Sequence, residues 1–141
     1  MKISAQSYYG LKAVTFLAKE SRVFSVKEIA DGERIPYDYL EKIMQKLTRA
    51  GLVTSKRGSA GGYSLKRPSS KITAKDILTA LDEAILPILC VMSNKSRSYC
   101  IMEKTCLSKN VWQRMQKAIN YSLNSITLAD LVYVNPKKSK R

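Results

Sequence analysis

The sequence contains no histidine, and its 141 residues include only three cysteines. Without histidine there is no Ser-His-Asp or Cys-His catalytic arrangement and no histidine-ligated metal site. An odd number of cysteines does not suit a disulfide framework and is more natural for reduced thiols. There is also no nucleotide-binding loop and no obvious pair of carboxylates in a pocket, so an enzyme is the least favoured class of protein.

Long apolar runs are absent as well. No stretch approaches the roughly eighteen consecutive apolar residues of a membrane-spanning helix. The first residues, MKISAQSYYGLKAV, lack the apolar core and cleavage site of a signal peptide. At 45% apolar and 26% charged residues, the composition is typical of one ordinary globular domain. We therefore expect a cytoplasmic protein with no membrane partner.

Acidic residues are scarce relative to basic ones. The chain has eleven Asp and Glu and twenty-five Lys and Arg, which gives a formal net charge of +14. Such an excess favours a polyanionic partner, and nucleic acid above all. The alternative is a solvated basic surface or the basic tail 136–141. Removing the four positive charges of that tail leaves about +10, so most of the excess belongs to the rest of the chain.

The first part of the chain predicts three helices. Residues 4–21 carry apolar side chains at helical spacing, with one buried face, at Tyr8, Leu11, Val14, Leu17 and Ala18. A second, short helix follows Ser25, because Ser25 and Glu28 make a capping box and Phe24 can pack on Ile29. We expect this helix to end at Asp31-Gly32.

The third predicted helix begins after Pro36 and ends at Gly51. Its apolar stripe is Leu40, Ile43, Met44 and Leu47. Its other face is polar and carries Asp38, Glu41, Lys42, Gln45, Lys46 and Arg49. A short helix, a tight turn and a second helix with a polar outer face suit the major groove of DNA.

A basic β-hairpin is predicted next, with strands at 52–57 and 63–66. The connecting GSAGG lacks the Gly-Lys-Ser/Thr ending of a P-loop and the GxGxxG spacing, and it leads into a strand. Glycines here suit a tight wing tip that approaches DNA closely. A hairpin loop that touches nothing is the alternative, but four flanking charges favour DNA contact: Lys56, Arg57, Lys66 and Arg67. The expected fold is mainly α with a small β-hairpin wing, a winged helix-turn-helix.

The second half of the chain predicts two more capped helices around a long one. Thr73 and Asp76 cap a helix, with an Ile72–Ile77 contact, that we expect to reach about Leu86 before Pro87. Residues 90–106 have no periodicity and are predicted to form a loop. A long helix over 110–125 has one apolar side, and a last capped helix starts at 126–131.

The long helix is too far from the winged part to bury both of its faces there, so we expect it to pair with a second chain. Packing back on its own domain is the alternative. The apolar residues expected at the dimer contact are Val111, Met115, Ile119 and Leu123, with Ala118 and Ile126 on the same side. The expected divisions are a DNA-binding domain (1–80), a cysteine loop and dimerisation helix (81–135) and a basic tail (136–141).

Several stretches resemble one known family. MKIS, YLEKIMQKLTRAGLV, SKRGSAGGYSL, ITAKDILTALDE and the closing CL…W…ITLADL occur in order from residue 1 to about 131. They resemble the Rrf2 family of bacterial winged-helix regulators, whose members include IscR, NsrR, RirA and the cluster-free CymR. The resemblance implies a homodimeric transcriptional regulator, expected to be a repressor, whose two winged domains read a palindromic double-stranded operator.

The resemblance also implies roles for individual residues. The residues expected at base edges are Tyr37, Asp38, Glu41 and Lys42, and Arg57 is expected to enter the minor groove. A carboxylate can accept from cytosine N4, and arginine suits the negative potential of a narrow minor groove. Phosphate contacts or wing positions are expected for Lys46, Arg49, Lys56, Gly58, Gly61, Gly62, Tyr63 and Lys66.

The three cysteines, Cys90, Cys100 and Cys106, lie within seventeen residues. Three thiolates can converge on a metal, and soft sulfur ligands favour an iron–sulfur cluster or zinc. This spacing is a weak pattern by itself, since small buried cysteines are common. In the family that the chain resembles, the same loop holds an iron–sulfur cluster through three cysteines. The resemblance therefore implies a cluster-bearing sensor of redox state, nitric oxide or iron supply, with a 2Fe-2S cluster favoured over 4Fe-4S.

The chain departs from the family pattern in two ways: the gap between Cys90 and Cys100 is longer than the family's usual spacing, and the fourth iron ligand is unassigned. Lys109 stands where related proteins have a histidine, and Tyr8 stands where others have a carboxylate from the partner's first helix. Glu103, a carboxylate or serine of the partner, a small external thiol or no ligand at all remain open. The alternatives to a cluster sensor are a regulator controlled by free thiols or by a partner protein, and, from another class, an iron–sulfur carrier or electron-transfer protein. The charge and the basic wing argue against the carrier.

Overall fold

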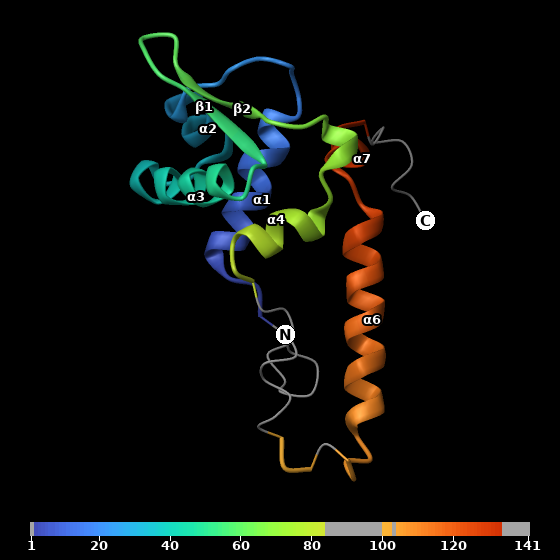
Figure 1. Ribbon diagram of the computed structural model, residues 1–141. Helices are drawn as coiled ribbons and strands as arrows, with labels where there is room; N and C mark the ends of the chain where they lie inside the picture. The colour runs from blue at the N-terminus through green and yellow to red at the C-terminus, as the bar shows by residue number, and fades with distance from the viewer. Residues whose placement is uncertain (1, 84–99, 103, 134–141) are drawn as a thin grey trace.

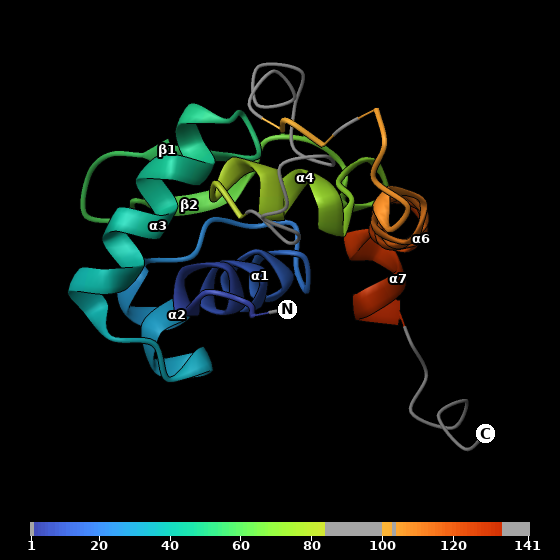
Figure 2. The same cartoon turned by 90° about the horizontal axis from the view of Figure 1, so that it is seen from below.

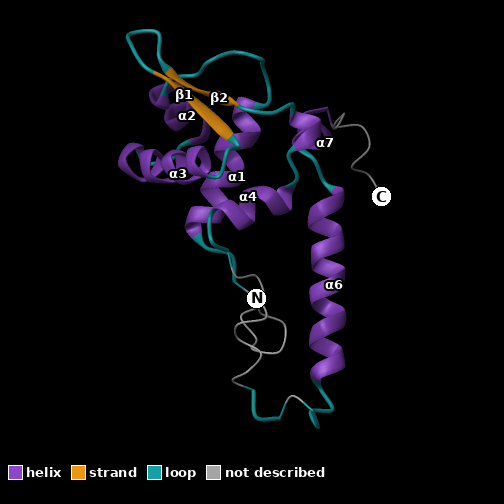
Figure 3. Cartoon of the chain, viewed as in Figure 1, coloured by secondary structure: helices purple, strands orange, loops and turns teal. Residues whose placement is uncertain are grey.

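The computed structural model describes residues 2–83, 100–102 and 104–133. It is mostly helical, with one antiparallel two-stranded hairpin (Figures 1 and 3). The elements are α1 (Ala5–Leu17), α2 (Val26–Glu33), α3 (Tyr37–Arg49), β1 (Val53–Lys56), β2 (Gly62–Leu65), η1 (Ser69–Lys71), α4 (Ala74–Ala80), α6 (Lys109–Ser125) and α7 (Leu128–Tyr133). The mainly α fold with a β-hairpin wing is therefore confirmed.

The core lies between α1, α2, α3 and the hairpin. The predicted stripe of α3 is fully buried, namely Leu40, Ile43, Met44 and Leu47. It packs against apolar side chains of the first two helices, among them Val14, Leu17 and Ile29. Because the whole stripe of α3 faces inward, its polar face is left at the surface.

Side-chain caps start three of the helices as the sequence predicts. The Ser25 hydroxyl accepts from the Glu28 N–H (3.1 Å), and the Glu28 carboxylate accepts from the Ser25 N–H (2.7 Å). Thr73 and Asp76 make the same reciprocal pair at α4, and Asp130 accepts from the N–H of Thr127 at α7. Each cap satisfies backbone donors that the first helical turn leaves without partners.

Two predicted helix boundaries in the first part of the chain are wrong. The first helix ends at Leu17 rather than near Ser21, and its buried face does not include Tyr8, which is 58% exposed. The second helix does not end at Asp31-Gly32 but runs to Glu33. Lys27 bonds Asp31 within it (2.7 Å), and the missing side chain of Gly32 leaves room for the Phe16 ring. The turn to α3 instead begins at Arg34, with φ 53°.

The helix that begins at Ala74 is shorter than predicted. It ends at Ala80 instead of near Leu86, and Asp82 then adopts a left-handed backbone conformation with φ 58°. A non-glycine residue in that conformation ends the helical hydrogen-bond pattern. Pro87, the expected end of the helix, lies outside the described residues, as does the basic tail 136–141.

The hairpin is joined to the start of α2 by backbone pairing. β1 and β2 pair from Val53↔Leu65 to Lys56↔Gly62. On the other edge of β2, Tyr63 pairs with Phe24, with N–H···O distances of 2.9 and 2.8 Å. Gly62, next to Tyr63, has φ 150°, and a Cβ there would overlap the Phe24 carbonyl group. The segment that leads into α2 thus adds a third, strand-like edge to the two-stranded wing.

The long helix α6 extends away from the winged part (Figures 1 and 2). Its range confirms the helix predicted over 110–125, and none of its residues is buried. At its end the chain returns to the winged part, where Ala74 donates to the Ile126 carbonyl and Leu128 donates to the Ile72 carbonyl, both at 2.9 Å. Leu128 is completely buried there. The described helices include none that is long and apolar enough to cross a bilayer.

The close approach of Gly62 to Phe24 leads to a stability prediction. Gly62→Ala places a methyl group against backbone that cannot move without breaking the Phe24–Tyr63 bridge, so it is expected to lower the free energy of unfolding. Gly58→Ala is the matched control, because Gly58 also has a glycine-like φ (109°) but nothing lies within 4 Å of its Cβ position. Chemical denaturation should show Gly62→Ala about 2 kcal/mol less stable than Gly58→Ala. Equal losses would mean that the bridge is not a constraint.

Candidate nucleic-acid interface

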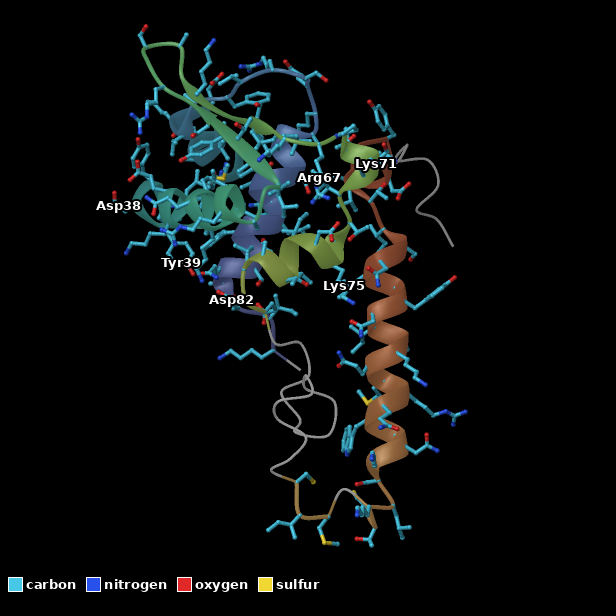
Figure 4. The ribbon with its side chains drawn as sticks, in the orientation of Figure 1. Asp38, Tyr39, Arg67, Lys71, Lys75 and Asp82 are labelled. Carbon is cyan, nitrogen blue, oxygen red and sulfur yellow. The ribbon has the colours of Figure 1, made fainter. Side chains whose placement is uncertain are left out.

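The outer face of α3 is open to solvent over its whole length. The residues expected at base edges, Tyr37, Asp38, Glu41 and Lys42, are all exposed. Figure 4 shows Asp38 at the outer end of this helix, pointing away from the core. Because Leu40, Ile43 and Met44 are buried on the opposite side, helix geometry holds this polar face outward. The structure therefore brings the four predicted base-edge residues to one end of α3, on its solvent side.

Two carboxylates on this face have no partner. Every other acidic side chain in the described ranges makes an ion pair or caps a hydrogen-bond donor, as Glu28, Glu33 and Asp130 do. Among the described acidic side chains, Asp38 and Glu41 alone make neither a hydrogen bond nor an ion pair. Two uncompensated negative charges thus lie on the exposed face of a strongly basic protein.

A groove of about 500 Å³ separates the wing from the starts of α2 and α3. Lys56 and Arg57 line it from the wing, and Tyr37 lines it from α3. Glycine backbone at the wing tip forms the rest of that wall, including Gly58, Gly61 and Gly62. The predicted wing residues and the start of the recognition helix therefore share one depression.

Tyr63 links the wing to the outer face of α3. It lies half-buried in β2, and its pKa is raised first by desolvation and then by the nearby negative charge of Glu41. The raised pKa keeps the phenol neutral, so its hydroxyl can donate a hydrogen bond at any physiological pH. Tyr63 is thus a structural part of the wing with a polar tip close to Glu41.

Not all of the predicted phosphate-contact residues lie at this groove. Arg49 is exposed at the end of α3. Lys66 lines a different cavity, of about 490 Å³, with Arg67, Arg22 and Tyr133. Lys46 lies on the flank of α3 and bonds Asp82, with its Nζ 3.0 Å from the Oδ2 atom. The structure therefore brings together Tyr37, Lys56 and Arg57 but separates Lys66 from them.

Lys27 and Ser25 line the groove although sequence reasoning did not select them. They belong to the start of α2, which the Phe24–Tyr63 pairing brings beside the wing. Both positive groups there already have partners, because the Glu28 carboxylate caps the start of α2 and Asp31 pairs with Lys27. The capped start of α2 was visible in the sequence, but its distance from the wing was not.

The cysteine region is described only in part. Cys90 lies outside the described residues, while Cys100 and Cys106 are free, half-buried thiols before α6. The Cys106 Sγ and Ser108 Oγ atoms share a hydrogen bond (3.2 Å), which lowers the pKa of Cys106, as do the N–H groups of Ser108 and Lys109. In the described ranges no three metal-binding side chains come together. Two thiols have the donor chemistry that iron prefers, but two alone do not make the site.

The long helix carries an exposed apolar face. Val111 is 53% exposed, Met115 is 39% exposed, and Ile119 and Leu123 are only partly covered. The turn before α6 adds three exposed apolar side chains, Ile101, Met102 and Leu107. Several exposed apolar side chains close together in the chain are typical of a contact with another chain.

A helical core, an exposed third helix and a basic wing beside it define a winged helix-turn-helix protein. A model of the Rrf2 family, described as an iron-dependent transcriptional regulator, matches residues 3–133. The chain is 34% identical over 134 residues to protein Rrf2 of Nitratidesulfovibrio vulgaris, covering 94% of this chain and 87% of that protein.

Two solved structures share this fold closely. CymR (YrzC), the global cysteine regulator of B. subtilis, superposes with a TM-score of 0.75 and 35% identity over 94% of this chain and 96% of that chain. IscR of T. potens superposes with a TM-score of 0.74 and 32% identity over 94% of this chain and 86% of that chain. The chain therefore belongs to the Rrf2 family of DNA-binding transcriptional regulators, and its relatives are named as regulators rather than enzymes.

Proposed function

We propose that this regulator reads a DNA operator with the outer face of α3 while the wing follows the adjacent backbone and minor groove. The observation that carries this proposal is the pair of free carboxylates, Asp38 and Glu41, on the exposed face of α3 beside a basic wing. In this orientation α3 enters the major groove and Arg57, at the wing, reaches the minor groove.

The free carboxylates favour base edges over phosphates. A carboxylate near a phosphate is repelled, whereas cytosine N4 offers a donor that only the major groove exposes. Tyr37 and Lys42 flank these carboxylates and complete a set of donors and acceptors. Lys56 at the groove supplies affinity through phosphate contacts without reading sequence.

The functional unit in this proposal is a homodimer. The apolar face of α6 and the apolar turn before it are exposed in the single chain, and a second copy would cover both. Two-fold symmetry then places two winged parts on one duplex, so the operator is a palindrome. The residues assigned to this contact are Val111, Met115, Ile119 and Leu123.

The regulatory part of the proposal is an iron–sulfur cluster held by Cys90, Cys100 and Cys106. The support is the family's description as iron-dependent and the soft thiol donors at Cys100 and Cys106. The lowered pKa of Cys106 favours the thiolate, which is the form that binds iron. When bound, the cluster would supply a site that changes on reaction with oxidants or nitric oxide; 2Fe-2S is the proposed type, and repression is the proposed mode.

Control by free thiols is the second candidate, and a specific observation favours it. The superposition with CymR, named as a global cysteine regulator, is as close as that with IscR. In addition, Lys109 occupies the position at which a histidine ligates the cluster in related proteins. The lowered pKa of the half-buried Cys106 favours the thiolate, the form that a thiol sensor without metal uses.

The proposed operator reading is tested by selecting duplexes from a random pool with the wild-type protein and measuring affinity against salt. Arg57→Ala is expected to weaken binding to the selected duplex by about 1–3 kcal/mol and to affect random duplexes less. Lys71→Ala is the matched control, because Lys71 is an exposed cation of η1 on the far side of the winged part (Figure 4).

Two results would contradict this part of the proposal. If no sequence is enriched from the random pool, the protein does not recognise a specific operator sequence. An equal loss on selected and random duplexes would make Arg57 a phosphate contact, and an equal loss for Lys71→Ala would mean that only total charge matters.

The cluster is tested by anaerobic purification followed by an absorption spectrum and analysis of iron and sulfide. The cluster proposal expects visible absorption bands and stoichiometric sulfide, both lost in Cys106→Ala. Ser122→Ala, at an exposed position of α6, is the control and should retain the cluster. A wild-type protein that stays colourless after reconstitution would contradict the cluster proposal. Control by free thiols would then be the remaining candidate.

A further inference from the structure

The last residues of the winged part, Leu81, Asp82 and Glu83, contact both α1 and α3. We call these three residues the junction. Leu81 is buried against α1, where Gly10 has no side chain to exclude it, and its carbonyl accepts from the Gln6 side chain (2.7 Å). The Glu83 carboxylate accepts from the Ser4 N–H (3.2 Å) and the Ser4 hydroxyl. Two of the three junction residues are thus fixed to the start of α1.

The third junction residue is bonded to the recognition helix. Asp82 has a left-handed backbone conformation (φ 58°), and its Oδ2 atom lies 3.0 Å from the Nζ atom of Lys46 on α3. The Asp82 side chain is 82% exposed and that of Lys46 is 36% exposed, so neither is held by burial. The contacts of its neighbours with α1 hold the backbone of Asp82 beside Lys46.

This contact competes with DNA. Lys46 lies on the flank of the polar face of α3, at helical spacing from Lys42 and Arg49 on that face. A phosphate and the Asp82 carboxylate would use the same ammonium group. Lys46 therefore has two alternative anionic partners, one inside the protein and one on the duplex.

We propose that Asp82 withholds Lys46 from the DNA backbone, so that release of the contact adds one phosphate interaction per subunit. This inference rests on the proposed function, because it assumes that α3 lies on DNA. The junction is also a natural point of control. In the sequence it leads directly into the segment that carries Cys90.

The test compares the salt dependence of binding for four proteins on the selected duplex. Each phosphate contact adds about 0.9 to the slope of log affinity against log salt. Asp82→Asn is expected to steepen the slope by about 0.9 per subunit and to bind more tightly at low salt. Asparagine tolerates the left-handed conformation well, so the variant should fold. Lys46→Gln should match the wild type, and the double variant should match Lys46→Gln.

Glu20→Gln controls for the loss of one negative charge, because Glu20 is exposed and its partner Arg22 keeps a second carboxylate, Glu28. It should leave the slope unchanged. A second readout is acetylation of Lys46 followed by mass spectrometry. DNA should protect Lys46 from acetylation in Asp82→Asn but not in the wild type.

Three outcomes overturn the inference. An unchanged slope in Asp82→Asn means that Asp82 withholds nothing. A shallower slope in Lys46→Gln than in the wild type means that Lys46 already contacts phosphate. A steeper slope that persists in the double variant assigns the effect to total charge. If the wild type shows no sequence-selective, salt-dependent binding, the proposed function itself fails, and the inference falls with it.

Discussion

The position of the wing depends on two backbone hydrogen bonds between Phe24 and Tyr63. They attach β2 to the residue that precedes the Ser25 cap, so the same few residues begin α2 and hold the hairpin. Phe24 is buried against the Phe16 ring, with ring centroids 5.0 Å apart, and the Arg22 guanidinium lies 3.8 Å from its ring centre. Because this pairing holds the wing beside the start of α2, the wing and the start of α3 line one groove.

The distribution of charge follows from the same arrangement. Most described carboxylates serve the fold, as Glu28 does at the α2 cap and Glu33 does between Lys12 and Lys19. Asp38 and Glu41 are left free where DNA bases would supply donors. Of the basic side chains that line the groove, Lys27 pairs with Asp31, whereas Lys56 and Arg57 make no hydrogen bond or ion pair with the described residues. The proposed function therefore assigns affinity and sequence reading to different side chains of one surface.

Much of the fold could be predicted from sequence because its determinants are local. The Ser25 and Thr73 caps and the apolar stripe of α3 each lie within a few residues, and all were confirmed. The errors came from tertiary contacts. Gly32 looks like a helix end, but it continues α2 because the Phe16 ring packs on it.

The candidate site followed the same division between local and tertiary information. The exposed polar face of α3 was predictable from helical spacing, and the basic hairpin that carries Arg57 was predictable from its composition. The approach of Lys27 to the wing, and the bond from Lys46 to Asp82, depend on pairings that are distant in sequence.

The central claim is that α3 and the wing together contact the DNA. Hydrogen exchange with and without the selected duplex tests it most directly. Protection of 37–49 and 57–62, with no change in η1, agrees with it. Protection confined to η1 and to the residues that line the cavity beside Arg67 would contradict it.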